Sequence, residues 1–385
     1  MYKRMLALDM WQSDTLFLWG ARQTGKSTLL RTLFPGARTY DLLLSDVYGR
    51  LTTNPAAVRQ ECEAAGLSGD TQRLPIIIDE VQKAPALLDE VHWLIENRGL
   101  RFILCGSSAR KLKRGHANLL GGRAVRYELY PLAFPEIAEF DLERALNHGL
   151  LPRHYQSKNP RRLLSSYVGD YLREEIAAES LIRNLPTFSR FLEVAALTNG
   201  EILTYTKVAS ECGVSSPTVK EYYQITIDTL LGRLLPAYVR RAKRRQIRSP
   251  KFYFVDIGVT ATLARRGVVR PRSELFGKAF EQFVVNEVFA YSHYSDKFFP
   301  VSYWKTASGA EIDLVLGEHQ VAVEIKSSAQ TRIRHLKGLR TFKEEFRPDK
   351  SLVVSLDPEP RRTEDGIDIL PWRVFLERLW AGEIL

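Results

Sequence analysis

Short apolar runs alternate with amphipathic segments over the first third of the chain. Apolar, β-prone residues fill positions 15–19, 39–43, 75–80, 101–105 and 125–129, and each run has the length of a buried strand. Residues 28–34 and 87–96 have the apolar spacing of helices. Strands that alternate with helices predict a mostly parallel sheet covered by helices, and we assign this α/β core to residues 1–137.

The middle of the chain has mainly helical spacing. Residues 138–186 contain a break at 149–152 and a charged helix over 167–180, which we interpret as a helical lid. Residues 206–214 and 215–223 have the pattern of a helix-turn-helix, with Gly213 in the turn. An apolar run, a basic stretch and another apolar run then predict a hairpin with a basic tip. Together these segments predict a winged-helix domain over residues 187–270.

The last third returns to strands after an amphipathic helix. The helix covers residues 277–287, a hairpin with a turn at Gly309 covers 302–316, and a further strand covers 321–328. This order predicts a separate α/β domain over residues 271–385.

Length and composition agree with several domains. The chain has 385 residues, of which 45% are hydrophobic, and this length suggests about two or three cores. The sequence has no stretch of signal-peptide or membrane-spanning character, so we expect a cytoplasmic protein without a membrane partner. Cys62, Cys105 and Cys212 are widely separated, and their spacing indicates neither a disulfide framework nor a zinc site.

The residues between the first strand and the first helix carry the clearest chemistry. They read G-A-R-Q-T-G-K-S, which fits the phosphate-loop pattern G-x-x-x-x-G-K-[ST]. The glycines let the backbone wrap around phosphates, and the helix N-terminus points unpaired N–H groups at them. We expect Lys26 to neutralise the β- and γ-phosphates and the Ser27 hydroxyl to ligate Mg²⁺. The expected ATP-binding residues are Gly20, Ala21, Arg22, Gln23, Thr24, Gly25, Lys26, Ser27 and Thr28.

Polar residues near later strands would complete a nucleotide site. Asp79 and Glu80 end a buried strand, where Asp79 can hold Mg²⁺ through water and Glu80 can polarise the attacking water. Ser107 follows the next strand and is either a sensor of the γ-phosphate or an ordinary turn former or helix cap. Arg123 is either a surface arginine or a group that stabilises transition-state charge in its own or a neighbouring subunit.

These motifs resemble those of a known family. G-A-R-Q-T-G-K-S, I-I-I-D-E-V-Q-K, G-S-S and L-G-G-R, followed by Y-P-L, look like the motifs of prokaryotic AAA+-type ATPases with a C-terminal domain of uncharacterised function. The resemblance covers nearly the whole chain. It implies a five-stranded AAA+ core, ATP hydrolysis with Mg²⁺ and the roles described above. It also leads us to expect a homo-oligomer.

Positive charge is concentrated in the middle third. Residues 151–270 contain 20 Lys and Arg against 10 Asp and Glu, whereas the rest of the chain has 35 of each. Six of the nine residues from 240 to 248 are cationic, which favours contact with a phosphate backbone. The alternative is a winged helix that only packs domains together. The expected DNA-binding residues are Lys220, Arg240, Arg241, Lys243, Arg244, Arg245 and Arg248.

The last domain carries a second group of polar residues. Glu324 and Lys326 project from one face of a strand, Asp313 lies on the neighbouring strand and Glu281 on the adjoining helix. Three such carboxylates can hold one or two Mg²⁺ ions, and the lysine can orient water or stabilise charge on a phosphodiester. The pattern is similar to the PD-(D/E)xK nuclease superfamily, which implies a restriction-endonuclease-like fold with these four positions as the site. Ile312 stands where that pattern has a proline.

These observations leave three functions open. The leading hypothesis is a Mg²⁺-dependent ATPase that acts on DNA in repair, recombination or junction processing, on forked or branched substrates, and whose nuclease-like C-terminal domain engages or cuts the DNA. The second is an ATP-driven remodelling or branch-migration ATPase whose nuclease-like domain only binds DNA or a partner. The third is a nucleotide-gated regulatory switch whose winged helix contacts protein alone.

Overall fold

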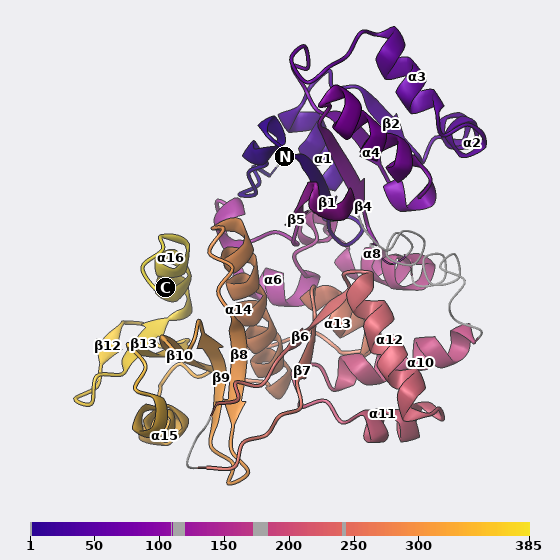
Figure 1. Ribbon diagram of the computed structural model, residues 1–385. Helices are drawn as coiled ribbons and strands as arrows, with labels where there is room; N and C mark the ends of the chain where they lie inside the picture. Colours follow the sequence, from indigo (N-terminus) through magenta and orange to yellow (C-terminus); the bar gives the residue numbers. More distant parts are fainter. Residues whose placement is uncertain (1, 109, 111–119, 172–183, 241–243) are drawn as a thin grey trace. The chain divides into compact units, whose positions relative to one another are not determined.

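The computed structural model describes residues 2–108, 110, 120–171, 184–240 and 244–385 (Figure 1). The chain forms two compact units. Unit 1 comprises residues 1–132 and 224–231, and unit 2 comprises residues 133–223 and 232–385. The predicted lid and C-terminal domain fall in unit 2, as does the predicted winged-helix domain except for residues 224–231, which belong to unit 1. The boundaries between these three domains stay predictions.

Unit 1 contains the predicted parallel sheet. Its five strands are all parallel and lie in the order β2-β3-β4-β1-β5. The strands are β1 (Thr15–Trp19), β2 (Thr39–Asp41), β3 (Ile76–Asp79), β4 (Phe102–Gly106) and β5 (Ala124–Glu128). All five predicted strands are therefore present, with ends that differ from the predicted ones by no more than two residues.

Helices cover this sheet because their apolar faces match its buried strands. The helices are α1 (Lys26–Leu33), α2 (Ser45–Thr53), α3 (Ala57–Ala64) and α4 (Leu87–Arg98), with short 3-10 helices at η1 (Asp9–Gln12), η2 (Val81–Lys83) and η3 (Leu120–Gly122). Leu51, Val58 and Val91, one from each of α2 to α4, pack in one buried cluster with Ile78 and Leu104 of the sheet. This burial supplies the main driving force for the layered arrangement.

The first part of unit 2 is helical. The described elements are η4 (Phe134–Glu136), α6 (Leu142–His148), α7 (Pro152–Gln156), α8 (Pro160–Ser166), a π-helical turn η5 (Tyr167–Tyr171), α10 (Leu185–Leu197), α11 (Tyr205–Cys212), α12 (Ser216–Asp228) and α13 (Ile257–Leu263). The residues of α12 from 224 onward belong to unit 1. Most of the predicted charged helix over 167–180 lies outside the described residues. Gly213 has φ 69° between α11 and α12, so the predicted glycine turn is present.

A short hairpin occupies the position of the predicted hairpin with a basic tip. Its strands are short, β6 (Gly232–Leu235) and β7 (Lys251–Phe254), and they pair antiparallel. We call residues 236–250, which join them, the strap. Backbone hydrogen bonds connect the strap to β8 (Val301–Lys305) and to the turn after it: Tyr238 N to Tyr303 O (2.6 Å), Ile247 N to Lys305 O (2.9 Å) and Ala307 N to Arg245 O (2.8 Å). Backbone groups in the described part of the strap therefore pair with β8, which is an edge strand, while residues 241–243 of the predicted basic tip lie outside the described residues.

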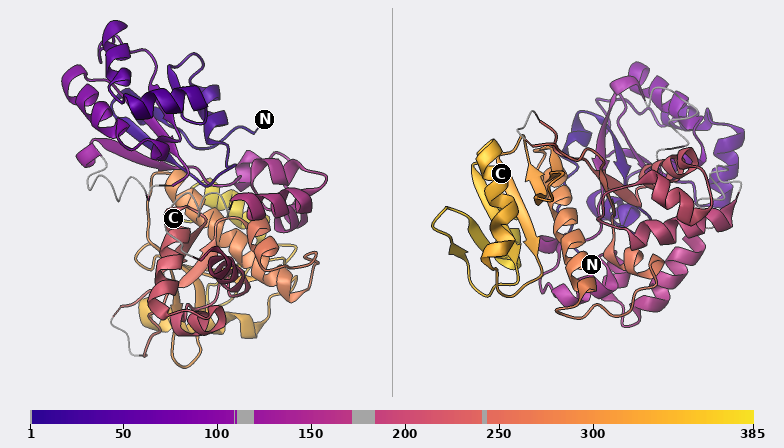
Figure 2. Two further views of the ribbon diagram at one scale, coloured as in Figure 1. Left: turned by 90° about the vertical axis from the view of Figure 1, so that its right-hand side faces the viewer. Right: turned by 90° about the horizontal axis from the view of Figure 1, so that it is seen from below.

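The rest of unit 2 contains a six-stranded mixed sheet in the order β12-β13-β11-β10-β9-β8. Its other strands are β9 (Glu311–Leu316), β10 (Val321–Lys326), β11 (Lys350–Ser355), β12 (Arg361–Arg362) and β13 (Asp368–Pro371), and its helices are α14 (Glu274–Tyr294), η6 (Ile333–Leu336), α15 (Lys337–Phe346) and α16 (Trp372–Trp380). Figure 2 and Figure 1 both show α14 running alongside this sheet.

Helix α15 packs on one face of this sheet. Ile312 and Val315 of β9 both lie in a buried cluster with Leu339 and Phe342 of α15. The register of β9 against β8 shifts between Ser302 and Trp304, so the side-chain alternation of β9 is interrupted between Ile312 and Val315. None of the helices in the described ranges has both the length and the hydropathy that a bilayer crossing requires.

Candidate functional site

The loop between β1 and α1 has the conformation that a phosphate-binding loop needs. Gln23 and Gly25 both have positive φ, 63° and 97°, which turns the chain sharply before α1 begins. A Cβ atom on Gly20 would lie 2.6 Å from the Leu129 carbonyl oxygen, so only glycine fits there. The sequence prediction and the local geometry agree for this loop.

Lys26 lies inside the loop. Its ammonium donates to the Gly20 carbonyl (2.7 Å) and to the Ala21 carbonyl (3.2 Å), and the residue is only 5% exposed. Both acceptors are neutral, and a buried ammonium gains considerably more from a phosphate that carries full negative charge. The loop therefore fits a nucleotide phosphate by the chemistry of its own groups.

Ser27 and Asp79 meet beside the loop. The Ser27 hydroxyl donates to Asp79 Oδ2 at 2.6 Å, and the Glu80 backbone N–H donates to Asp79 Oδ1 at 3.0 Å. Asp79 is 5% exposed. A hydroxyl and a carboxylate this close together form a pair of oxygen ligands that fits Mg²⁺.

Glu80 and Ser107 are brought together by a third residue, Gln82. The Gln82 amide donates to Glu80 Oε2 and to Ser107 Oγ (3.1 Å), and Ser107 Oγ lies 3.4 Å from Glu80 Oε2. Glu80 itself has φ 59°, an uncommon conformation for a residue with a side chain. Sequence reasoning gave Gln82 no role, although its position two residues after Glu80 in the D-E-V-Q-K run was the available signal.

Arg4 is a second residue that sequence reasoning missed. Its guanidinium donates to the Thr24 carbonyl (2.6 Å) and to the Tyr130 carbonyl (2.7 Å). It therefore ties the phosphate loop to the segment that follows β5. No motif includes Arg4, because it lies far upstream of the loop.

Arg123 lies at the far end of the sheet from the loop. It directly precedes β5, whose first residue Ala124 is level with Thr15 at the start of parallel β1, whereas the loop follows the end of β1. Five residues of strand separate the two ends by about 17 Å. The Arg123 side chain is exposed and pairs with Glu96. A role within its own site does not fit this position, so only the neighbouring-subunit role remains as a proposal.

The predicted DNA-binding cations have mixed environments. Arg240 pairs with Glu318, while Arg244 pairs with Glu344 (3.0 Å) and Glu345 (2.5 Å). The Lys220 ammonium lies over the Tyr205 ring at 5.3 Å. Arg245 and Arg248 are exposed. Arg241 and Lys243 lie outside the described residues.

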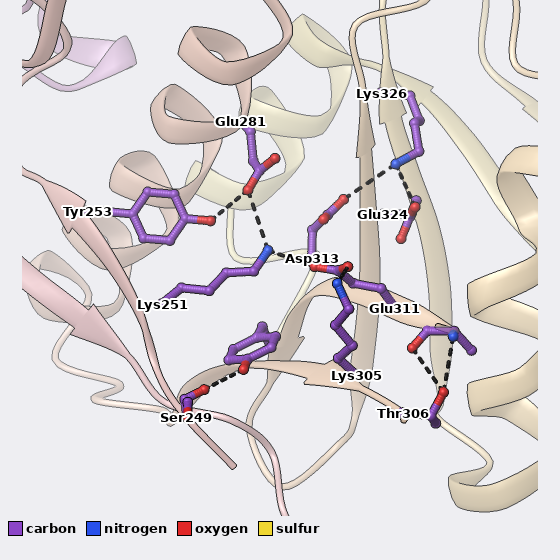
Figure 3. Close-up of polar contacts among 12 residues, drawn as sticks. Ser249, Lys251, Tyr253, Glu281, Lys305, Thr306, Glu311, Asp313, Glu324 and Lys326 are labelled. Atoms are coloured by element: carbon purple, nitrogen blue, oxygen red, sulfur yellow. Dashed lines mark hydrogen bonds and ion pairs between the residues drawn. The ribbon is translucent and has the colours of Figure 1, made fainter. Parts of the chain in front are cut away.

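The four predicted residues of the nuclease-like site lie close together around β9 and β10 (Figure 3). Lys326 Nζ is 2.6 Å from Glu324 Oε1 and 3.8 Å from Asp313 Oδ2. Asp313 Oδ2 also accepts from the Ile325 backbone N–H at 2.7 Å. Glu281 approaches from α14. With Glu311 at the start of β9, these carboxylates form what we call the acidic cluster: Glu281, Glu311, Asp313 and Glu324.

Two side chains of strand β7, which the sequence did not indicate, contact the acidic cluster. Tyr253 Oη donates to Glu281 Oε1 at 2.6 Å. Lys251 Nζ lies 2.8 Å from Glu311 Oε1 and 3.7 Å from Glu281 Oε1. Lys251 and Tyr253 are two residues apart, so both project from the same face of β7. No signal near residue 251 indicated this contact, because it depends on how β7 packs against α14.

Burial and the neighbouring charges shift the pKa values of these groups. Burial raises the pKa of Glu281 and, with the Asp313 carboxylate, raises that of Glu324 well above its ordinary value. Burial lowers the pKa of Lys251, but the carboxylates of the acidic cluster outweigh it, and the net shift is upward. Among the described residues, no group of three or more His, Cys, Asp or Glu side chains has metal-binding geometry. The metal-ligand roles of Glu281, Asp313 and Glu324 stay predictions.

Comparisons with known families divide the chain into three parts. Residues 12–138 match a family described as an AAA domain. Residues 139–268 and 276–375 match two families that are each described as a domain of unknown function. The match over residues 276–375 therefore does not identify a nuclease. The match to the AAA family, together with the loop geometry, supports an AAA+ P-loop ATPase domain in unit 1.

The related proteins add little about function. Uncharacterized proteins of Mycobacterium bovis and Mycobacterium tuberculosis are each 26% identical over 333 residues, which covers 84% of this chain and 72% of theirs. Among solved structures, the Aeropyrum pernix ORC1 protein in complex with DNA is 12% identical, covering 66% of this chain and 86% of that one, with a TM-score of 0.29. A signal-transduction ATPase with a tetratricopeptide repeat sensor from Pyrococcus horikoshii is 13% identical, covering 75% and 46%, with a TM-score of 0.22. Neither of these two structural similarities supports a functional assignment.

Proposed function

We propose that this protein is a Mg²⁺-dependent ATPase that acts on DNA. The observation that supports the ATPase most strongly is the buried Lys26 ammonium, which donates to the Gly20 carbonyl of the loop. It is joined by the Ser27 hydroxyl, which donates to Asp79 Oδ2 at 2.6 Å. A cytoplasmic location and a homo-oligomer belong to the same proposal.

The residues of the loop would each have a defined task. Bound MgATP supplies the phosphoanhydride bond that is hydrolysed. Lys26 would exchange its two carbonyl acceptors for phosphate oxygens, and Ser27 and Asp79 would hold the Mg²⁺ ion. Glu80 would orient and polarise the attacking water. The Gln82 amide holds the Glu80 carboxylate next to the Ser107 hydroxyl by donating a hydrogen bond to each.

Two variants separate binding from hydrolysis. Lys26→Ala should lose both nucleotide affinity and turnover, because the cation that holds the phosphates is gone. Glu80→Gln should still bind ATP but hydrolyse it at least about a hundredfold more slowly, since it removes a general base. Measuring both affinity and turnover tests the assignment, and a Glu80→Gln variant with normal turnover would contradict it.

DNA contact is the second part of the proposal. It is supported by the excess of positive charge in residues 151–270 and by exposed Arg245 and Arg248. Replacing both arginines with alanine should weaken DNA binding and lower the salt slope by about two. Arg98→Ala, which changes an exposed arginine outside residues 151–270, is the matched control. Equal DNA affinity for both variants would favour a nucleotide-gated switch that contacts protein alone.

Metal-dependent DNA cleavage is a second candidate function. It is supported by Lys326 lying between the Asp313 and Glu324 carboxylates. Cleavage of plasmid, forked or four-way-junction DNA with Mg²⁺ or Mn²⁺ should be lost in Asp313→Ala. If neither protein cleaves but branched DNA stimulates ATP turnover, the alternative holds: a remodelling or branch-migration ATPase whose C-terminal domain only binds.

A further inference from the structure

Strand β7 places a buried lysine against the acidic cluster. We propose that Lys251 is a tethered counter-ion of this cluster, and that its ammonium competes with a divalent cation for the same carboxylates. The position of β7 would then control whether a metal ion can enter. This inference deepens the second candidate function and rests on it for the location of the site.

The contacts of Lys251 are those of an internal cation. The residue is 4% exposed, and its Nζ lies 2.8 Å from Glu311 Oε1 and 3.7 Å from Glu281 Oε1 (Figure 3). The Tyr303 ring lies 5.2 Å from the same ammonium. A buried ammonium between two carboxylates neutralises charge that would otherwise require protons or another cation.

The acidic cluster has capacity for a further cation. Glu324 is 7% exposed, and its Oε2 has no hydrogen-bond partner, although Oε1 is paired with Lys326. Figure 3 shows the Asp313 and Glu324 side chains both directed toward Lys326. A buried carboxylate oxygen without a donor is an unsatisfied acceptor, and a metal ion would satisfy it.

Lys251 differs from Lys326 in how it is held. Lys326 lies on β10, on the same face as Glu324 and two residues away, so its backbone stays beside Glu324 whatever the position of β7. Lys251 belongs to β7, which pairs with β6 and follows the strap on β8. Separation of β7 from α14 would remove Lys251 and the Tyr253 hydrogen bond from Glu281 together, while β9 and β10 remain intact.

The experiment measures Mn²⁺ binding by electron paramagnetic resonance of free Mn²⁺. All proteins carry Asp79→Asn, which removes the acidic ligand of the nucleotide site, and no nucleotide is added. Lys251→Met should bind Mn²⁺ at least about tenfold more tightly than the protein with Lys251, because a unit charge a few ångströms from the metal is gone. Mn²⁺ should also raise its unfolding temperature. Lys251→Gln, which keeps a polar end, is the second variant and should behave likewise if the methionine does not fold.

The control is Lys305→Met. Lys305 pairs with the other oxygen of Glu311, at 2.6 Å, and it is partly exposed. Its replacement should leave Mn²⁺ affinity within about threefold of the parent. Adding Glu281→Gln to Lys251→Met should abolish the gain. Equal affinity with and without Lys251, an equal gain from Lys305→Met, or a gain that survives Glu281→Gln would each overturn the proposal. Binding is measured without DNA or ATP, so the result is independent of whether the protein cleaves DNA or hydrolyses ATP.

Discussion

At the residue scale, the nucleotide site depends on side chains outside the motif that reveals it. The loop itself could be predicted because its glycines, lysine and serine have a fixed spacing. Gln82 and Arg4 could not, because their roles come from tertiary contacts with Ser107 and with the Thr24 carbonyl. Lys251 belongs to the same class, since its partners lie at least 30 residues away in the sequence.

Gln82 provides the first test at this scale. Gln82→Ala removes the amide that connects Glu80 to Ser107, so the Glu80 carboxylate loses its orientation while the loop stays intact. We expect ATP turnover to fall about ten- to a hundredfold, with nucleotide affinity within about threefold of wild type. Steady-state turnover and equilibrium binding measured on the same preparation check this. A parallel loss of affinity would show that Gln82 supports the loop instead.

Glu287 provides a test that depends on pH. It is 2% exposed, accepts from Phe134 N and Trp380 Nε1, both at 2.9 Å, and burial raises its pKa to about 8. The folded state therefore holds a proton that the unfolded state releases above about pH 4.5. The proton held by Glu287 therefore raises the free energy of unfolding at low pH, and this contribution to stability is lost as the pH rises from about 4.5 toward 8.

Comparison with Glu287→Gln isolates this effect. Glutamine cannot titrate, and its amide cannot accept from both donors, so the variant should be less stable at pH 5. From pH 5 to 7.5, its unfolding free energy should approach that of wild type by up to about 1.4 kcal/mol per pH unit. Denaturant unfolding at several pH values measures this. Parallel curves for the two proteins would show that Glu287 does not titrate in this range.

At the element scale, regular alternation made the strands and helices predictable, whereas pairing between distant segments was not. The strands of unit 1 follow short apolar runs, which is why their positions could be predicted closely. The strap could not be predicted, because its partner β8 lies more than 50 residues further on. Its cationic residues predict a basic tip that contacts phosphates, and two of them, Arg240 and Arg244, form ion pairs within unit 2.

The pairing of the strap with β8 can be tested by hydrogen exchange. Ile247 N donates to Lys305 O, and proline at this position has no N–H to donate. Ile247→Pro should therefore increase exchange at the amides of Tyr238 and Ala307 about tenfold or more, because the adjacent hydrogen bonds then open more often. Exchange in the strands of unit 1 should not change. Unaltered protection of the strap would contradict this account of the edge strand.

At the scale of the whole molecule, the proposed role of Arg123 in ATP hydrolysis is linked to the proposed homo-oligomer. Arg123 precedes β5 at the N-terminal end of the parallel strands, whereas the phosphate loop lies at their C-terminal end, about 17 Å away along the strands. A contribution to hydrolysis would then require a second copy of the chain.

Mixing variants tests this requirement. Arg123→Ala and Lys26→Ala should each have less than about a tenth of wild-type turnover. Mixed together, they should regain activity, because an intact Lys26 site can meet an intact Arg123 from its neighbour. Turnover per chain should also rise with protein concentration. No recovery in the mixture, with turnover independent of concentration, would assign Arg123 to the surface ion pair with Glu96 alone.

The central claim is that the loop around Lys26 binds and hydrolyses ATP. The most direct measurement is ATP affinity and turnover, with Mg²⁺, for wild type, Lys26→Ala and the surface control Lys3→Ala. We predict that wild type and Lys3→Ala bind and hydrolyse ATP equally, while Lys26→Ala loses turnover and at least about tenfold in affinity. A wild-type protein that neither binds nor hydrolyses ATP, or that matches Lys26→Ala in both, would contradict the account.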